Sequence, residues 1–442
     1  MSETTSGAHI SFVQDPGRVR DLARQIADGK LSPVALVERY LARIRVADPH
    51  VQCWREVDAA RALALARERE QQVKSGHILG ALHGIPIAVK DIIDVEGLPT
   101  RCNSRSRADA KPATGDAEIV LALRRQGAIP LGKVHTTEFA FFDPSPARNP
   151  HNLEHTPGGS SSGSAAAVAA GMAPIALGTQ TVASVNRPAA YCGIAAFKPS
   201  TRSLSTFGIA PLAPSYDTVG FYGYTVEDAV AAFEAVAPGF LRPAATDVKR
   251  ALTIIVPEDH HLGDASVEVQ ASMARMGTLF AKAGHRIEGR VSPIDFTRLD
   301  HLQRRTMFYE AGRALAHLRD LPKGMAGEKI LGAVNEGLAI DTAAYLEMRF
   351  EIDAMRDVFF GKTRDADLYL WPATPEPAPK GLAWTGEPKY IAPWTALGGP
   401  IVTLPIGKTS SGLPLGCLLA GRPGEDHDMC RNARRVAALL DR

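Results

Sequence analysis

The chain of 442 residues is long enough to bury one large core or two ordinary ones. Its 50 lysines and arginines nearly balance its 48 aspartates and glutamates, so the net charge of +2 gives no reason to expect nucleic acid or an anionic membrane as a partner. Five scattered cysteines without a C-x-x-C pair disfavour a disulfide framework and a structural zinc site, and they suit a reducing cytoplasm.

Helices are predicted in the N-terminal part of the chain. Its first residues, MSETTSGAH, lack the charged-then-apolar pattern of a signal peptide. Residues 19–26 carry apolar side chains at helical spacing, and Gly29 can end this helix. Ser32-Pro33 supplies an N-cap and a first-turn proline for a second helix, and residues 59–74 predict a third. No apolar run in the sequence reaches the roughly 20 residues that a membrane-spanning helix needs.

Lys90 ends the apolar run GIPIAV, whose side chains suit a buried strand. Burial lowers the pKa of a lysine because desolvation penalises the ammonium, so a neutral amine becomes attainable at about pH 7. This makes Lys90 a candidate base. On the strand pattern alone, however, the favoured interpretation is a strand end or an ion pair with Asp91 or Asp94.

A strand–helix–strand unit follows. Asp116 can cap a helix that runs to Gln126, Gly127 can stop it, and residues 128–131 predict the next strand. Such a unit indicates an α/β fold, with parallel strand pairs in a sheet that helices cover on both faces.

The serine-rich block that begins TPGGSSSGSAAAVAAGM at Thr156 admits three interpretations. It can be a flexible linker, or a nucleophile elbow that places Ser161 at the centre of G-x-S-x-G, or a site that uses Ser160 and Ser184 with a base from elsewhere. A linker would not run straight into a helix and a strand of core residues. An elbow should follow a strand, and the preceding HTP is a poor strand.

The remaining elements are predicted from shorter patterns. A turn is expected at Gly178-Thr179, before Ser184. Residues about 285–365 are mostly helical by pattern and match no motif, so we expect a lid or a pocket-forming segment. His260-His261 in an acidic turn is more typical of solvated side chains than of a metal site. Further strands and helices are predicted at 252–256, 266–283, 367–371, 401–406 and about 428–440.

Three blocks resemble, in order and spacing, the amidase signature family: GIPIAVKDIID with Lys90, GGSSSGSAAAVAAGM with Ser160, and GTQTVASVNRPAAYCG with Ser184. The similarity runs from about Leu31 to Val219 and again from about Tyr369 to the C-terminus. The resemblance implies an α/β amidase signature fold, a large mixed and partly parallel twisted β-sheet covered by helices on both faces. It implies a single amidase domain over 1–442, with an N-terminal helical layer at about 16–75, a catalytic core at about 80–235 and 366–442, and a variable pocket or lid segment at about 240–365.

Residue roles carry over by position in these motifs. The resemblance implies a Ser–cis-Ser–Lys triad, in which Lys90 is the general base, Ser160 relays a proton after a cis peptide bond, and Ser184 is the nucleophile. The oxyanion hole would be formed by backbone N–H groups of Thr181, Val182, Ala183 and Ser184. The supporting residues would be Ser161, Gln180 and Arg187.

Departures from the family pattern occur beside the nucleophile. The family commonly has Gly-Gly there, whereas this chain has Val182-Ala183, and a need for positive φ at either position would strain or reshape the loop. The common aspartate before the loop is Gln180. The family's arginine is replaced by Asn186, and Arg187 follows one place later.

The resemblance implies a cytoplasmic hydrolase that cleaves the C–N bond of a small or aryl acyl amide, carbamates (urethanes) included, through an acyl-enzyme and without a cofactor or metal. A small-molecule amide or carbamate is the expected partner, nucleic acid and membrane are not expected, and a homodimer is compatible with the sequence. The alternatives are the amidase component of a tRNA-dependent amidotransferase acting on glutamine, a weakly active binding protein of the same fold, and an α/β-hydrolase that uses Ser161.

Overall fold

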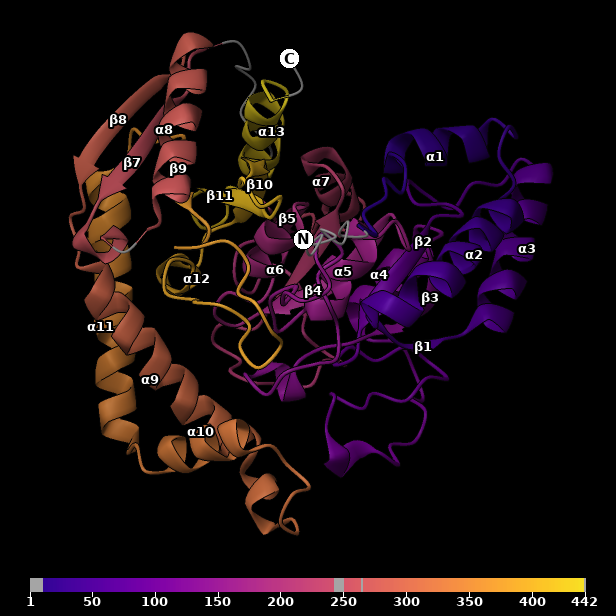
Figure 1. Cartoon of the computed structure of the whole chain (residues 1–442), viewed down its shortest axis with the longest axis horizontal. Helices are drawn as coiled ribbons and strands as arrows, with labels where there is room; N and C mark the ends of the chain where they lie inside the picture. Colours follow the sequence, from indigo (N-terminus) through magenta and orange to yellow (C-terminus); the bar gives the residue numbers. More distant parts are fainter. Residues whose placement is uncertain (1–10, 242–249, 264, 441–442) are drawn as a thin grey trace, which may run out of the picture.

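The computed structural model describes residues 11–241, 250–263 and 265–440. Near the N-terminus, helices gather at one end of the molecule, drawn in indigo on the right of Figure 1. Ser32 caps the second of them, because its hydroxyl accepts from the N–H groups of Val34 and Ala35. The predicted N-terminal helices are confirmed as α1 (Val19–Ala27), α2 (Pro33–Val51) and α3 (Ala59–Lys74).

The described residues contain one sheet of 11 strands, in the order β1-β3-β2-β4-β6-β5-β10-β11-β9-β7-β8. Parallel pairs join β2 to β3 and β4, and β7 to β8 and β9, whereas the other ladders are antiparallel. The predicted mixed, partly parallel sheet is confirmed. Its strands are β1 (Trp54–Val57), β2 (Pro86–Lys90), β3 (Ile129–Val134), β4 (Ile175–Gln180), β5 (Ala195–Lys198), β6 (Thr218–Gly223), β7 (Thr253–Glu258), β8 (Arg286–Val291), β9 (Leu368–Pro372), β10 (Ile401–Lys408) and β11 (Pro414–Ala420).

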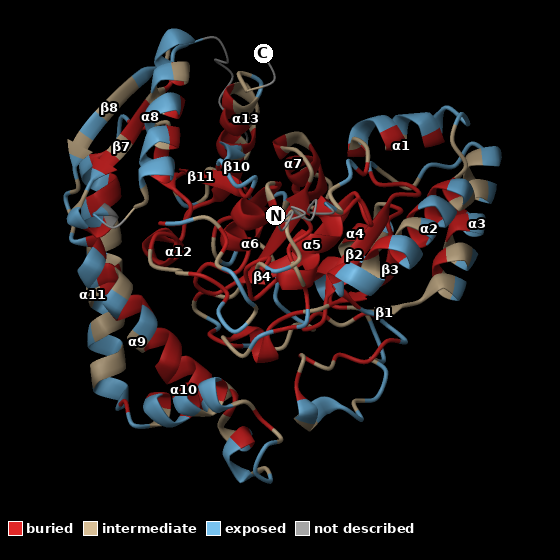
Figure 2. Cartoon of the chain, in the orientation of Figure 1, coloured by how far each residue is buried: buried red, intermediate tan, exposed pale blue. Residues whose placement is uncertain are grey.

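Helices surround this sheet, and the sheet with its nearest helices forms the buried centre of the molecule (Figure 2). The long helices α9 and α11 project to one side in Figure 1 and expose one face each. None of the described helices is long and apolar enough to cross a membrane. The remaining helices are α4 (Glu118–Arg125), α5 (Ser162–Ala169), α6 (Asn186–Cys192), α7 (Val226–Glu234), α8 (Val267–Lys282), α9 (Phe296–Ala314), α10 (Glu328–Leu338), α11 (Thr342–Lys362), α12 (Ala392–Leu397) and α13 (Asp426–Ala437).

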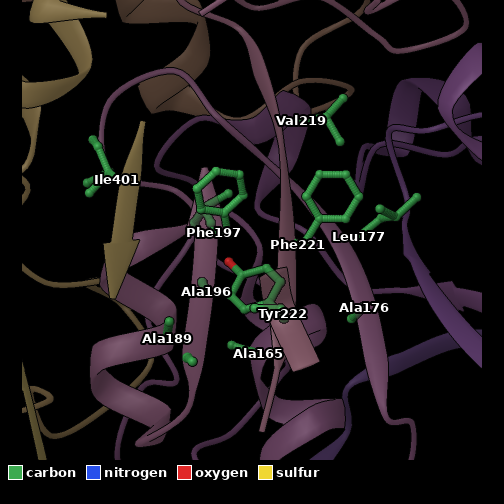
Figure 3. Packing of buried hydrophobic residues seen from close by; sticks show 14 of the residues in the cluster. Ala165, Ala176, Leu177, Ala189, Ala196, Phe197, Val219, Phe221, Tyr222 and Ile401 are labelled. Atoms are coloured by element: carbon green, nitrogen blue, oxygen red, sulfur yellow. The ribbon is translucent and has the colours of Figure 1, made fainter. Parts of the chain in front are cut away.

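The two faces of the sheet are packed differently near the serine block. Successive strand residues point to opposite faces, so neighbours on β6 meet different helices. The ring of Phe221 lies 6.0 Å from that of Phe233 on α7. Tyr222 lies on the other face, where α5 and α6 supply small side chains such as Ala165 and Ala189 (Figure 3). These small residues let the helices approach the sheet closely.

Two local predictions are wrong. Gly178-Thr179 lies inside β4 and forms no turn. Gly178 serves close packing instead, because a methyl group there would lie 2.7 Å from Ser161 Oγ. Asp116 does not cap α4, since its carboxylate accepts from the N–H of Glu96 at 2.9 Å and from Arg124 at 2.9 Å.

The segment at about 285–365, which is predicted to be mostly helical, also contains a strand. Residues 286–291 form β8, which extends the sheet at its edge beyond β7. The alternating charges of RIEGRV hide this strand in the sequence, because edge strands are often protected by charged side chains and lack an apolar pattern. The helices α9, α10 and α11 that follow agree with the prediction.

Candidate active site

Lys90 is the last residue of β2, and its side chain is fully buried. The amine Nζ lies 2.7 Å from Ser160 Oγ and 2.8 Å from Thr179 Oγ1. Burial lowers the pKa of Lys90 to about 7, against a smaller opposite effect from the carboxylate of Asp217. A large fraction of this amine is therefore neutral at about pH 7 and able to accept a proton.

The carboxylates that follow Lys90 in the sequence have other partners. Asp91 Oδ1 lies 3.2 Å from Nζ of Lys133, and both side chains are buried. Asp94 Oδ1 accepts from Thr100 Oγ1 at 2.6 Å. Within the described residues neither carboxylate pairs with Lys90, so the ion-pair interpretation of this lysine is wrong.

Ser160 follows a cis peptide bond from Gly159, which confirms the bond implied by the family resemblance. The carbonyl of Gly159 accepts from Arg187 Nη2 at 2.7 Å. The carbonyl of Ser160 accepts from the N–H of Thr137 at 3.0 Å. Because both flanking carbonyls are fixed in this way, the Ser160 hydroxyl is held at the amine of Lys90.

Ser184 lies beside the serine block although it comes later in the chain. The N–H of Ser161 donates to the Ser184 carbonyl at 3.3 Å, and the Tyr222 hydroxyl donates to the same carbonyl at 3.1 Å. The residue is 7% exposed. The backbones of the serine block and of Ser184 are therefore adjacent, whereas no hydrogen bond joins the Ser160 and Ser184 hydroxyls in this part of the described chain.

The hydroxyl of Ser161 is hydrogen-bonded to the neighbouring strand β4. Its Oγ donates to the carbonyl of Thr179 at 3.2 Å and accepts from the N–H of Thr179 at 3.3 Å, and its side chain is fully buried. No strand leads into this serine, contrary to what a nucleophile elbow requires. All residues of 156–192 are buried, so the flexible-linker interpretation is wrong.

Gln180 organises the loop before Ser184. Its Oε1 accepts from the N–H groups of Val185 at 2.9 Å and Asn186 at 3.0 Å. Its Nε2 donates to Thr395 Oγ1 at 2.9 Å. An amide at this position thus accepts and donates at once, whereas the aspartate common in the family can accept only.

Residues 181–184 are held through their carbonyls. Thr181 O accepts from Gln303 Nε2 at 2.9 Å, while Thr181 Oγ1 donates to Asp217 Oδ1 at 2.6 Å. Neither Val182 nor Ala183 has positive φ, so the replacement of Gly-Gly does not force a left-handed backbone. Among the described residues no protein acceptor engages the N–H groups of the candidate oxyanion hole, Thr181, Val182, Ala183 and Ser184.

Arg187 joins the serine block to a loop near the C-terminal part of the chain. Besides Gly159, its guanidinium donates to the carbonyl of Gly386 at 2.5 Å and to Thr385 Oγ1 at 3.1 Å. Burial lowers the pKa of Arg187 to about 10. Asn186, which stands at the family's usual arginine position, donates instead to Thr403 Oγ1 at 3.0 Å.

A cavity of about 450 Å³ opens beside Val182. The helices α9 and α10, from the segment expected to form a pocket or lid, contribute much of its wall. Its aromatic lining consists of Phe141, Phe142, Phe308 and Trp384. Its charged lining consists of Asp300, Arg304, Lys329, Glu336 and Glu387.

Several site residues are not predicted from the sequence. Thr179 lies within the third motif, but its contact with Lys90 from the strand beside β2 is concealed by the expected turn at Gly178-Thr179. Asp217 and Gln303, which hold Thr181, come from segments without a recognisable pattern. No sequence signal identifies the cavity residues of α9 and α10, because a lining side chain has no fixed residue type.

The described residues contain no group of three or more histidine, cysteine, aspartate or glutamate side chains placed to hold a metal ion. In the acidic turn, the ring nitrogens of His261 contact Thr297 Oγ1 at 3.1 Å and the carbonyl of Lys389 at 2.7 Å.

Comparison with known sequences agrees with this geometry. A sequence model of the family described as Amidase matches residues 35–430. The chain is 31% identical to a glutamyl-tRNA(Gln) amidotransferase subunit from Anaeromyxobacter sp. (strain K), over 96% of each protein. It is 37% identical to the corresponding protein from Roseiflexus castenholzii (strain DSM 13941 / HLO8), where the match spans 58% of this chain and 56% of that protein.

Comparison with solved structures also finds amidases with a similar fold. A crystal structure of an amidase superposes with a TM-score of 0.87 at 28% identity, covering 96% of this chain and 99% of that one. The native peptide amidase from Stenotrophomonas maltophilia superposes with a TM-score of 0.80 at 26% identity, covering 95% and 96%. The chain belongs to the amidase signature family.

Proposed function

We propose that this protein hydrolyses amide bonds by attack of Ser184, with Ser160 relaying the proton and Lys90 accepting it. The observation that carries the proposal is the buried Lys90 amine, whose pKa is lowered to about 7, at 2.7 Å from the Ser160 hydroxyl. A serine is a weak nucleophile unless a base removes its proton. Membership of the amidase family supports the same chemistry.

Two proton transfers accompany the attack. The Ser184 hydroxyl proton passes to Ser160 Oγ as the Ser160 proton passes to Lys90 Nζ, and Ser184 Oγ bonds to the substrate carbonyl carbon. Ser160 then gives its proton to the leaving nitrogen as Lys90 returns a proton to Ser160, and the C–N bond breaks to give an acyl-Ser184 and a free amine. Water repeats the sequence and releases the acid. Proton transfer by placed groups contributes about 10²–10⁴-fold to such rates.

The developing oxyanion would be bound by N–H groups of residues 181–184. Supporting this, the carbonyls of Thr181 and Val182 accept from Gln303 and Thr395, which fixes the backbone of the loop. Loss of one oxyanion donor typically costs about 2.7–4 kcal/mol of transition-state stabilisation.

The substrate we propose is a small or aryl acyl amide, carbamates included. Aromatic side chains on the cavity wall would bury an aryl group, and Val182, two residues before Ser184, lies in the same lining. A volume of about 450 Å³ lies within the range of about 300–1,000 Å³ that small-molecule pockets usually have.

The test is a comparison of Ser184→Ala and Ser161→Ala with the wild-type protein on amides, esters, ureas and carbamates. We expect Ser184→Ala to abolish turnover and a serine-directed reagent to label Ser184 in the wild type. Turnover that persists in Ser184→Ala but is lost in Ser161→Ala would exclude the proposed nucleophile. Ligand binding by the wild type without turnover of any probe would identify a binding protein of this fold.

A second candidate function is that of the amidase component in a tRNA-dependent amidotransferase. The observation that favours it is the similarity to a glutamyl-tRNA(Gln) amidotransferase subunit over 96% of each protein. A protein with this function would act on glutamine and need partner chains. Co-purification of a partner together with glutamine hydrolysis that depends on it would establish this function over the stand-alone amidase.

A further inference from the structure

The N-terminus of α10 receives its hydrogen-bond acceptors from a distant part of the chain. A helix leaves the first backbone N–H groups without partners inside the helix, and the N-cap Gly327 has no side chain to supply one. The N–H of Gly327 donates to Glu138 Oε2 at 2.8 Å, and the N–H of Ile330 donates to Asp143 Oδ2 at 2.9 Å. Two carboxylates from residues 138–143 thus cap this helix.

The loop that carries these carboxylates is folded back on itself. The N–H of Glu138 donates to the carbonyl of Asp143 at 3.0 Å, which brings the two residues together. Between them, Phe139 and Ala140 have φ values of 45° and 61° in the left-handed region, which is unusual for residues other than glycine. Strained backbone of this kind persists where surrounding contacts fix it, and here it turns both carboxylates toward α10.

Both partners of this contact also form the wall of the cavity. Phe141 and Phe142 lie in the loop between the two carboxylates, and α10 contributes Lys329, Gly332 and other residues to the lining of the same cavity. Because Glu138 and Asp143 hold the N-terminus of α10 against this loop, they set the distance between the phenylalanines of the loop and the cavity-lining residues of α10.

Lys329 adds a third connection across the cavity rim. Its Nζ donates to the carbonyl of Phe142 at 3.2 Å and to that of Ala383 at 3.0 Å. The next residue, Trp384, stacks on Phe142 with ring centroids 5.8 Å apart. The helix, the loop and the segment around Trp384 are thus joined at one corner of the cavity.

Gly327 is tightly packed against the two carboxylates. A methyl group added at Gly327 would lie 2.4 Å from Glu138 Oε2 and 2.5 Å from Asp143 Cγ. Glu138 is also fixed from its other side, because it accepts from the hydroxyl of Ser104 and is 6% exposed. This close fit supports a single docked position for α10.

We propose that Glu138 and Asp143 are positioning residues that hold α10 as the outer wall of the substrate cavity and thereby determine how well aryl substrates bind. The inference rests on the proposed amide hydrolysis, which supplies the reaction to be measured. It concerns residues that touch neither the triad nor the reacting bond. Their loss should therefore act on KM for substrates that reach the helical wall, and act less on kcat.

The experiment compares Glu138→Ala, Asp143→Ala and Asp143→Asn with the wild type, using para-nitroacetanilide as the aryl probe and acetamide as a probe too small to reach α10. Asp341→Ala is the control for loss of a helix cap alone, because Asp341 is the N-cap residue of α11 and accepts from the N–H of Ala344 at 2.9 Å without joining the helix to a distant loop. We expect the alanine variants at 138 and 143 to raise KM for the aryl probe about tenfold with kcat within about threefold of wild type. Acetamide kinetics should change little, and Asp143→Asn, which keeps an acceptor oxygen, should recover most of the affinity.

Hydrogen exchange provides a readout that does not depend on activity. Amides of residues 327–338 should exchange faster in Asp143→Ala than in Asp341→Ala or the wild type, because α10 is released from the loop. Unchanged exchange in α10, or equal losses on both probes through kcat, would overturn the inference. If the wild type hydrolyses neither probe, the proposed function fails while the exchange measurement still tests the anchoring of α10.

Discussion

Lys90 and Lys198 share an environment but differ in their contacts. Both lysines are fully buried, and burial lowers the pKa of each to about 7. Lys198 Nζ donates to the carbonyl of Pro199 at 2.7 Å, an acceptor that cannot give up a proton. Lys90 Nζ contacts two hydroxyls, and a hydroxyl can both accept and donate. Burial lowers the pKa of an amine, so that its neutral form can accept a proton. The proton must then come from a neighbouring group that can donate one, such as a hydroxyl.

Hydrolysis should depend on pH through Lys90. Because the ammonium form cannot accept a proton and its pKa is about 7, kcat/KM should fall below that pH and level off above it. We expect a slope of about tenfold per pH unit on the acid side, measured with para-nitroacetanilide. Lys198→Met should keep this profile. A rate that rises toward acid would exclude Lys90 as the base.

Sequence patterns identify the catalytic candidates but not their surroundings. Lys90 is recognisable as a buried lysine at a strand end, yet the strand pattern alone favours a plain strand end or an ion pair with Asp91 or Asp94 over a base. Two contacts decide against the ion pair: Asp91 is paired with Lys133, and the amine of Lys90 is hydrogen-bonded to Thr179. Both depend on strand register between segments far apart in the chain, which residue types do not encode locally.

At the level of elements, the loop before Ser184 depends on one amide side chain. Replacing Gln180 by Leu would leave the buried N–H groups of Val185 and Asn186 without acceptors. An unsatisfied buried group costs about 1–3 kcal/mol, so the loss of two acceptor contacts should lower the free energy of unfolding by about 2–6 kcal/mol in urea denaturation. The exposed substitution Gln25→Leu on α1 should stay within about 0.5 kcal/mol of wild type. An equal effect of the two changes would contradict this role.

The packing of α9 against α10 depends on glycine at one crossing point. A methyl group at Gly337 would lie 1.7 Å from the carbonyl oxygen of Phe308, so Gly337→Ala must push the helices apart. Overpacking of this kind costs about 1–3 kcal/mol, and thermal unfolding should show a lower Tm. Gly332→Ala on the same helix is the control, since nothing lies within 4 Å of the added methyl. It should raise Tm slightly, because alanine favours helix by about 1 kcal/mol over glycine.

Elements with strong local patterns are predictable, and those set by distant contacts are not. The helix over 59–74 and the cap at Ser32 follow from short-range rules and agree with the structure. The sequence predicts a turn at Gly178 because glycine is common in turns, whereas this glycine lies in β4 to accommodate Ser161. The same residue type serves two purposes, and only the neighbouring chain distinguishes them.

In the whole molecule, the sheet around the site is assembled from distant parts of the sequence. β10 pairs with β5 and β11, and β11 pairs with β9, so the C-terminal strands complete the sheet that holds Lys90 and the serines. The segment with α9, α10 and α11 is inserted between these parts, and its helices α9 and α10 supply part of the cavity wall. Phe141, Val182 and Trp384 complete the wall from other parts of the sequence, so the cavity also depends on contacts between distant segments.

The C-terminal helix should be required for the stability of this assembly. Asp426, fully buried at the start of α13, accepts from the N–H and the hydroxyl of Ser200, each at 2.6 Å, just after β5. Hydrogen bonds to a charged group contribute about 1.5–3 kcal/mol each, so Asp426→Ala should lower the free energy of unfolding by about 3–5 kcal/mol. The slope of the urea transition should stay unchanged if the protein still unfolds as one unit. Asp341→Ala, at an exposed helix cap, should cost only about 1 kcal/mol. Equal decreases in the free energy of unfolding for Asp426→Ala and Asp341→Ala would contradict this role of the contact between α13 and the end of β5.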